Sequence, residues 1–187
     1  TESNRGHDSY AISMFDYWDS YLAQYEITFR KSSPSGVMCS YDAENGNPSC
    51  ANSYILNDVM RGKFGQEHAL VTTDCGAVSN MKGPPTNTPT NALAAAYMIN
   101  NGTDIEMGST VWTDHMKEAV QQGDIVLHAF PHNGHNGLAT ATMIDSAVNE
   151  SSRVAEALGL QVPRSMSQRD VPGTPRSIIP LLRARNV

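Results

Sequence analysis

Residues 36–52 read GVMCSYDAENGNPSCAN, and residues 69–78 read ALVTTDCGAV. In each segment a short apolar run, 37–41 in the first and 69–73 in the second, leads into a polar turn, which is the pattern of a buried strand and its exit loop. The second run ends on the carboxylate of Asp74. Residues that follow the strands of an α/β barrel lie at its mouth, where catalytic side chains gather. Asp74 is therefore the leading candidate for a catalytic residue.

Helical patterns flank and separate these two strands. Ser13, with Asp16 three residues later, predicts the start of a helix, and Pro34 predicts its end. Residues 102–108 are typical of a third short strand with its exit turn. The alternation of helices and strands predicts consecutive βα units around a parallel sheet. The first helix is expected to pack on the core through Phe15, Trp18, Leu22, Tyr25 and Phe29, and further helices are predicted at 52–62, 91–101, 112–122 and 138–160.

Three blocks of this chain, in order, resemble family 3 of the glycoside hydrolases, the retaining β-glucosidases and β-xylosidases. Residues 37–52 are similar to the family segment VMCSYNxxNGxPxCA, and residues 16–29 to its DLxxTYLxxF helix. Residues 102–106, GTDIE, are similar to its Gly-Thr-Asp-Leu/Ile segment. The resemblance runs from about residue 5 to residue 122, and the cysteine after Asp74 is typical of the β-xylosidase branch.

The resemblance implies an α/β fold that is part of a (β/α)₈ TIM barrel, about its last three βα units. A complete barrel takes about 250 residues, and this chain has 187. We expect the partial barrel domain to span residues 1–160. Four prolines after residue 162 predict an irregular, extended tail over 161–187.

The resemblance also assigns roles to three side chains. Asp74 matches the family's nucleophile, whereas without the resemblance it would be read as a cap on the turn that follows. Tyr41 and Met38 match residues that line the sugar subsite. Side chains alternate along a strand, so Met38 and Tyr41 start from opposite faces, and Met38 is also a common core residue. For both to line the subsite, the strand has to bend as it ends.

Retaining hydrolysis needs two carboxyl groups about 5–5.5 Å apart, and only the nucleophile matches here. The family positions matching Asp104 and Glu106 do not carry the acid. The residues that hold the sugar in the family precede the region matched here, and the acid lies on a later domain. We expect a β-linked oligosaccharide or glycoside as substrate and a partner chain or missing domain that completes the site. The alternative is a non-catalytic barrel remnant that acts as a sugar-binding or structural module.

Cys39 and Cys50 flank an Asn-Gly-Asn-Pro loop that would bring them together. They form either a disulfide, which indicates an oxidising compartment, or two buried thiols in a cytosolic protein. The family often carries cysteines at both places, which favours the bridge and a secreted, extracellular protein. Cys75 is expected to be free, because Met107 stands where β-xylosidase-like members have a cysteine.

The composition argues against several kinds of partner. A net charge of −6 with few lysines is unsuited to nucleic acid, and no run of 18 apolar residues predicts a membrane span. His128, His132 and His135 suggest zinc by their spacing, but their segment is rich in Gly, Asn and Pro and lacks the Glu of a His-Glu-x-x-His motif. We expect neither a metal nor a cofactor.

Overall fold

The computed structural model describes residues 4–32, 34–130, 139–166 and 176–187. Contacts along the chain divide it into two compact units, Thr1–Ile125 and Val126–Val187. The first unit contains the motifs that carry the resemblance. The expected domain boundary after residue 160 stays a prediction.

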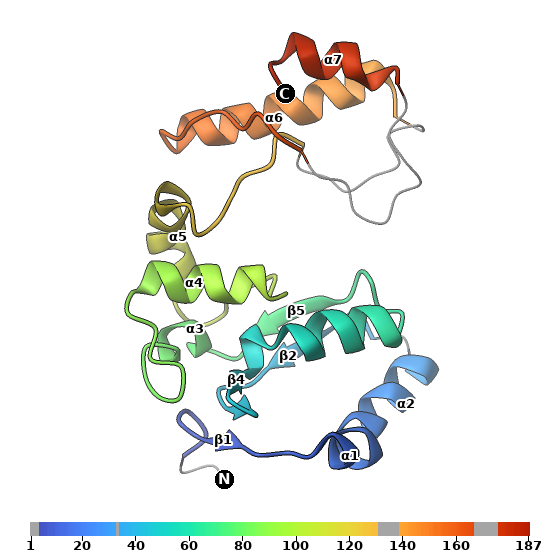
Figure 1. Cartoon of the computed structure of the whole chain (residues 1–187), viewed down its shortest axis with the longest axis vertical. Helices are drawn as coiled ribbons and strands as arrows, with labels where there is room; N and C mark the ends of the chain where they lie inside the picture. Colours follow the sequence, from blue (N-terminus) through green and yellow to red (C-terminus); the bar gives the residue numbers. More distant parts are fainter. Residues whose placement is uncertain (1–3, 33, 131–138, 167–175) are drawn as a thin grey trace. The chain divides into compact units, whose positions relative to one another are not determined.

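The first unit is built on two parallel strands (Figure 1). β2 (Gly36–Cys39) pairs with β5 (Leu70–Thr73) over four residue pairs. Where a third strand was predicted, a parallel bridge joins Thr72 to Ile105. The parallel α/β arrangement predicted from the sequence is thus confirmed, and the described residues form no closed barrel.

The helix before β2 differs from its prediction. It consists of α1 (Met14–Asp16), a π-helical segment η1 (Tyr17–Tyr21) and α2 (Leu22–Ser32). The predicted cap is confirmed, because Ser13 Oγ accepts the Asp16 N–H at 3.1 Å. The predicted apolar stripe is wrong in two places: Phe15 is 74% exposed and Tyr25 50%. A π turn closes over five residues instead of four, so it rotates the following residues out of an α-helical register. The buried residues of this helix are Tyr17, Leu22 and Phe29.

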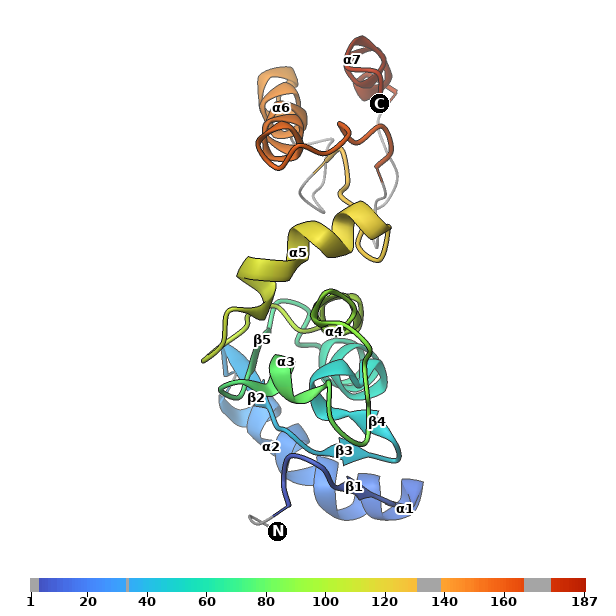
Figure 2. The same ribbon diagram turned by 90° about the vertical axis from the view of Figure 1, so that its left-hand side faces the viewer.

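The remaining elements of the first unit surround the parallel pair (Figure 2). A second, small sheet has the order β1-β3-β4, with two residues in each strand. No sequence pattern predicted it, since two residues show no periodicity. The strands are β1 (Ser9–Tyr10), β3 (Ala43–Glu44) and β4 (Asn47–Pro48), and the helices are the 3₁₀ helix η2 (Ser49–Ala51), the π-helix η3 (Tyr54–Lys63), α3 (Ala77–Asn80), α4 (Asn91–Asn100) and α5 (Val111–Gln122).

The two faces of the parallel sheet differ sharply in burial. Val71 and Thr73 lie on the core side and are 0% and 1% exposed. The pairing register puts Met38, Leu70 and Ile105 on the opposite face, where they are 60%, 45% and 38% exposed. The core therefore lies on one side of the sheet only. It gathers residues of β2, β5, η3, α3 and α4, among them Leu56, Met60, Val78, Ala95 and Met98.

The second unit contains α6 (Ala141–Ala157) and α7 (Ile178–Ala184). Phe130, Ile144, Val148 and Ile178 form its apolar cluster. The extended tail predicted for 161–187 is wrong over α7. Pro180 lies in the first turn of that helix, where a backbone N–H has no intrahelical acceptor to lose. Within the described part of the chain, no helix has the length and apolar character needed to cross a bilayer.

Candidate active site

Asp74 follows β5 directly, at the carboxyl end of the parallel strands. Its backbone N–H donates to the Cys39 carbonyl at 2.9 Å, which continues the pairing with β2 by one step. Its carboxylate Oδ1 accepts the N–H of Cys75 at 2.7 Å. The backbone on both sides of Asp74 is therefore fixed, and the carboxylate is held at the sheet edge.

Tyr41 lies beside Asp74, as the sequence predicted for two residues of one site. Its hydroxyl donates to the Cys75 carbonyl at 2.6 Å. Partial burial raises the pKa of Tyr41, and the negative charge of Asp74 raises that pKa further. The phenol is therefore kept neutral as a hydrogen-bond donor at the nucleophile candidate.

Arg5 is a residue of this site that the sequence did not predict. Its guanidinium lies 4.8 Å from the centre of the Tyr41 ring, within the range of a cation–π contact. Several hydrogen bonds hold the segment that carries it; among them, Asn80 Nδ2 donates to the Gly6 carbonyl at 2.6 Å, and the Ala43 N–H donates to the Asp8 carbonyl at 2.9 Å. These contacts join residues that are far apart in sequence, so a local sequence pattern does not predict them.

The segment after Ile105 packs against the turn that carries Asp74. The Gly76 N–H donates to the Met107 carbonyl, and the Met107 N–H donates to Thr73 Oγ1, both at 2.9 Å. Gly108 has a φ of +67°, and a Cβ there would lie 2.5 Å from the Cβ of Cys75. Only glycine fits this close approach. Cys75 itself is free and exposed.

Cys39 and Cys50 are joined by a disulfide with a Cα–Cα distance of 5.0 Å. The bridge ties the end of β2 to η2 and closes the loop that carries Tyr41. In the same loop Asp42 accepts a hydrogen bond from Ser40 Oγ. Burial raises the pKa of Glu44. The hydrogen bond that the side-chain amide of Asn52 donates to Glu44 at 3.2 Å lowers this pKa, but by less. The disulfide and these hydrogen bonds hold the loop that carries Tyr41 in place.

Two further carboxylates near the sheet have structural partners. Asp104 Oδ2 accepts bonds from Arg61 and from the Val71 N–H, each at 2.7 Å. Glu106 accepts the N–H groups of Val111 and Trp112 at 3.1 and 2.7 Å, at the start of α5. Both residues anchor the third βα unit, so both have a structural task.

Met38, the third predicted site residue, lies on the exposed face of β2. This is the face opposite Cys39, as strand alternation predicts. Its part in substrate binding stays a prediction.

The histidines considered as zinc ligands fall mostly outside the described residues, because His132 and His135 lie in 131–138. In the ranges that the structure describes, no group of three or more His, Cys, Asp or Glu side chains is arranged to hold a metal ion.

Comparisons with known proteins show what the chain is similar to. The exo-1,4-β-xylosidase xlnD of Aspergillus niger is 38% identical over 116 residues, 61% of this chain and 14% of the relative. The probable exo-1,4-β-xylosidase xlnD of Aspergillus terreus is 38% identical over 124 residues, 66% of this chain and 15% of the relative. No protein-family model matches the chain.

Solved structures give the same relationship. A GH3 exo-β-xylosidase (XlnD) in complex with a xylobiose aziridine activity-based probe superposes with a TM-score of 0.61 and 32% identity, covering 65% of this chain and 16% of that one. The GH3 β-glucosidase of Bifidobacterium adolescentis superposes with a TM-score of 0.53 and 27% identity, covering 67% and 16%. The chain therefore spans only about one-sixth of the length of these relatives.

Proposed function

Because the chain is related to a segment of the family 3 glycoside hydrolases, the β-xylosidases and β-glucosidases, we propose that it is the nucleophile-bearing part of a retaining β-glycosidase barrel. In this proposal it comprises about the last three βα units of a (β/α)₈ barrel. The parent enzyme is secreted and removes β-linked xylose or glucose from the non-reducing ends of glycosides. One observation carries the proposal: Asp74 stands at the carboxyl end of a parallel strand, with the Tyr41 hydroxyl beside it.

The proposed reaction is a double displacement. An Asp74 carboxylate oxygen attacks the anomeric carbon and forms a glycosyl ester while an acid protonates the leaving oxygen; water then cleaves the ester. Tyr41 lies beside the attacking carboxylate and steadies the turn that carries it, because its hydroxyl donates to the Cys75 carbonyl. The Cys75 N–H fixes the other side of the same carboxylate. Positioning of this kind contributes to the rate only when the sugar is also held.

The acid and the groups that hold the sugar are proposed to come from polypeptide outside these 187 residues. The 187-residue chain alone should therefore turn over p-nitrophenyl β-xyloside and β-glucoside at background rate, since general acid assistance typically contributes about 10²–10⁴-fold. Asp74→Ala is the control for that assay. Turnover that disappears in this variant would show that the chain carries its own acid.

A chimera tests the nucleophile. In it, this chain's matching residues replace the matched segment of the Aspergillus niger xylosidase. A 2-fluoro xyloside should label the peptide that spans residues 71–78, and Asp74→Asn should lower kcat by about 10³-fold or more, as loss of a nucleophile does. Asp58→Asn, on the exposed side of η3, is the matched control and should keep activity. Label on Asp104 or Glu106 would overturn the assignment of Asp74, and an inactive chimera that still binds xylose would support the non-catalytic alternative.

A further inference from the structure

Two asparagines of this sequence begin an N-glycosylation acceptor triplet, Asn-x-Ser/Thr with any residue but proline in the middle. The triplets are Asn-Gly-Thr at 101–103 and Asn-Glu-Ser at 149–151. Asn149 lies within the helix α6, where its Nδ2 donates to Asp145 Oδ2 at 3.3 Å. Asn101 instead follows the last residue of α4, as the C-cap of that helix. Acceptor asparagines belong to surface loops and turns, so Asn101 is the better placed of the two.

The turn at Asn101 is held by contacts that a glycan would leave in place. Asn57 Nδ2 donates to the Asn101 carbonyl at 3.2 Å, and Arg61 donates to the Gly102 carbonyl at 2.9 Å, so both contacts use the backbone of the turn. The side chain of Asn101 donates from Nδ2 to the Tyr97 carbonyl at 2.7 Å. Glycosylation replaces one of the two hydrogens on this nitrogen. The other N–H can still donate to the Tyr97 carbonyl.

The ring of Tyr97 offers an apolar surface beside Asn101. The two residues are four apart, and residues at this spacing are neighbours on the surface of a helix. Tyr97 is 36% exposed, and Asn101 is half-buried. The C–H groups on one face of a sugar ring can pack on an exposed aromatic ring as other apolar groups do. The first sugar of a glycan on Asn101 would therefore have a protein surface to cover.

Asn101 lies at the end of the parallel sheet opposite to Asp74. The bridge that joins Thr72 to Ile105 is parallel, so the chain after Asn101 runs in the same direction as β5. Asp74 follows the carboxyl end of β5, whereas Asn101 precedes the bridge at its amino end. A glycan on Asn101 would consequently leave the candidate active site open.

We propose that Asn101 carries an N-linked glycan, which is added before this part of the chain folds. The site rests on the secretion proposed for the parent enzyme, which the Cys39–Cys50 disulfide supports. The co-reactant is an oligosaccharide carried on a lipid diphosphate. A bond forms between Asn101 Nδ2 and the anomeric carbon of the oligosaccharide, and the bond from that carbon to the diphosphate oxygen breaks. The lipid diphosphate leaves, and the amide gives one proton to a base of the transferase.

The order of modification and folding follows from Thr103, the third residue of the triplet. Its hydroxyl donates to the Cys50 carbonyl at 2.6 Å, and the residue is only 3% exposed. The acceptor triplet requires this hydroxyl. Folding therefore hides a part of the acceptor that the transferase has to reach, although Asn101 itself stays at the surface.

Expression of the full 187-residue chain behind a cleaved secretion signal in a eukaryotic host tests the site. Peptide:N-glycosidase should remove a glycan and convert Asn101 to aspartate, which peptide mapping locates; an untreated sample controls for spontaneous deamidation of the Asn-Gly pair. Asn101→Gln should abolish this modification, whereas Asn149→Gln and Thr103→Ser should keep it. The added signal makes the result independent of where the parent enzyme resides. Asp74→Ala should be modified equally, so failure of the glycan and failure of the catalytic proposal are distinguishable.

A transfer assay with purified oligosaccharyltransferase and its lipid-linked donor tests the order. The reduced, alkylated and unfolded chain should be modified at Asn101 at least about tenfold faster than the folded chain, in which a buried hydrogen bond has to open before Thr103 is available. Unfolded Thr103→Val, which lacks the hydroxyl, should not be modified. The proposal is wrong if Asn101 of the secreted chain carries no glycan, or if the folded chain is modified as fast as the unfolded one.

Discussion

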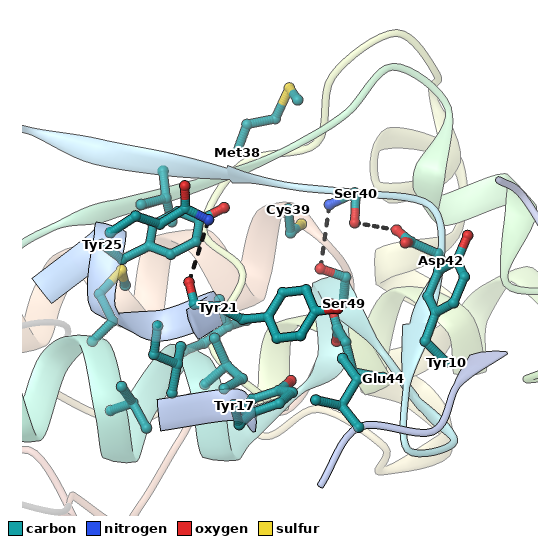
Figure 3. Close-up of a pocket in the computed structure, with 18 of the residues that line it drawn as sticks. Tyr10, Tyr17, Tyr21, Tyr25, Met38, Cys39, Ser40, Asp42, Glu44 and Ser49 are labelled. Carbon is teal, nitrogen blue, oxygen red and sulfur yellow. Dashed lines mark hydrogen bonds between the residues drawn. The ribbon is translucent and has the colours of Figure 1, made fainter. Parts of the chain in front are cut away.

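The edge of β2 that meets β5 and the edge that faces α2 are made by the same four residues but are covered very differently. At the first edge the strands pair in register, and the absence of a side chain on Gly36 lets the two backbones come together. At the second edge a cavity of about 780 Å³ separates β2 from Tyr21 and Tyr25, which are half-exposed (Figure 3). Parallel sheets are normally covered by helices on both faces. The contrast shows that a backbone in register holds β2 on one side, whereas side chains of the preceding helix and of η3 line the other side.

The strongest consequence should follow from breaking the closed edge. A Cβ at Gly36 would lie 2.3 Å from the Leu70 carbonyl oxygen, so Gly36→Val should force the strands apart and lower the free energy of unfolding by about 3 kcal/mol or more. Urea denaturation followed by circular dichroism measures it. Met38→Thr, on the exposed face of the same strand, should change stability by less than about 0.5 kcal/mol. Equal losses in the two variants would mean that the close approach at Gly36 is not the cause.

The disulfide supports the loop at the end of the closed edge. Because Cys39 and Cys50 are separated by 11 residues, their replacement by alanine should cost about 2–3 kcal/mol, mainly by releasing the unfolded chain. The double variant and the reduced native chain should have the same melting temperature in thermal denaturation. Cys75→Ser, at the exposed free thiol, should leave the melting temperature almost unchanged. A similar loss in that variant would mean that the bridge is not the cause.

The Arg61–Asp104 pair fastens the third βα unit to β5, and its loss should have an intermediate effect. Asp104→Asn weakens the bonds that Oδ2 accepts from Arg61 and Val71 and should cost about 1–2 kcal/mol, less than a fully buried pair because Asp104 is partly exposed. Asp58→Asn is the control on the same unit. Native-state hydrogen exchange should show faster exchange around residues 103–107. Unchanged exchange at these residues would show that the Arg61–Asp104 pair does not stabilise this part of the fold.

The parallel strands and most helices of this protein were predictable from the sequence, because apolar runs and amphipathic spacing report burial locally. The cap at Ser13 was predictable for the same reason. The exposure of Phe15 and Tyr25 was not, since a π turn changes which side chains share a face without leaving a composition signal. The helix α7 was missed because Pro180 was read as a helix breaker, although it sits in the first turn.

The candidate site was predictable only in part. Asp74 and Tyr41 follow neighbouring strands, so the parallel register brings them together. Arg5 depends on the pairing of two-residue strands and on the Gly6–Asn80 bond, which join segments far apart in the chain. Long-range placement of this kind follows from tertiary packing and not from any local pattern.

The weakest effect that we predict concerns Glu44, which lines the cavity beside β2. Burial raises its pKa above the ordinary 4.5, so the folded chain favours the protonated form more than the unfolded chain does. The stability that this provides is complete below pH 4.5 and is lost as the pH rises through the raised value. Glu44→Gln stays neutral and can still accept the Asn52 bond, so its stability relative to the native chain should improve from pH 4 to pH 7. Melting temperatures at both pH values, with exposed Glu67→Gln as the control, measure it. A Glu44→Gln advantage of the same size at pH 4 and at pH 7 would contradict this prediction.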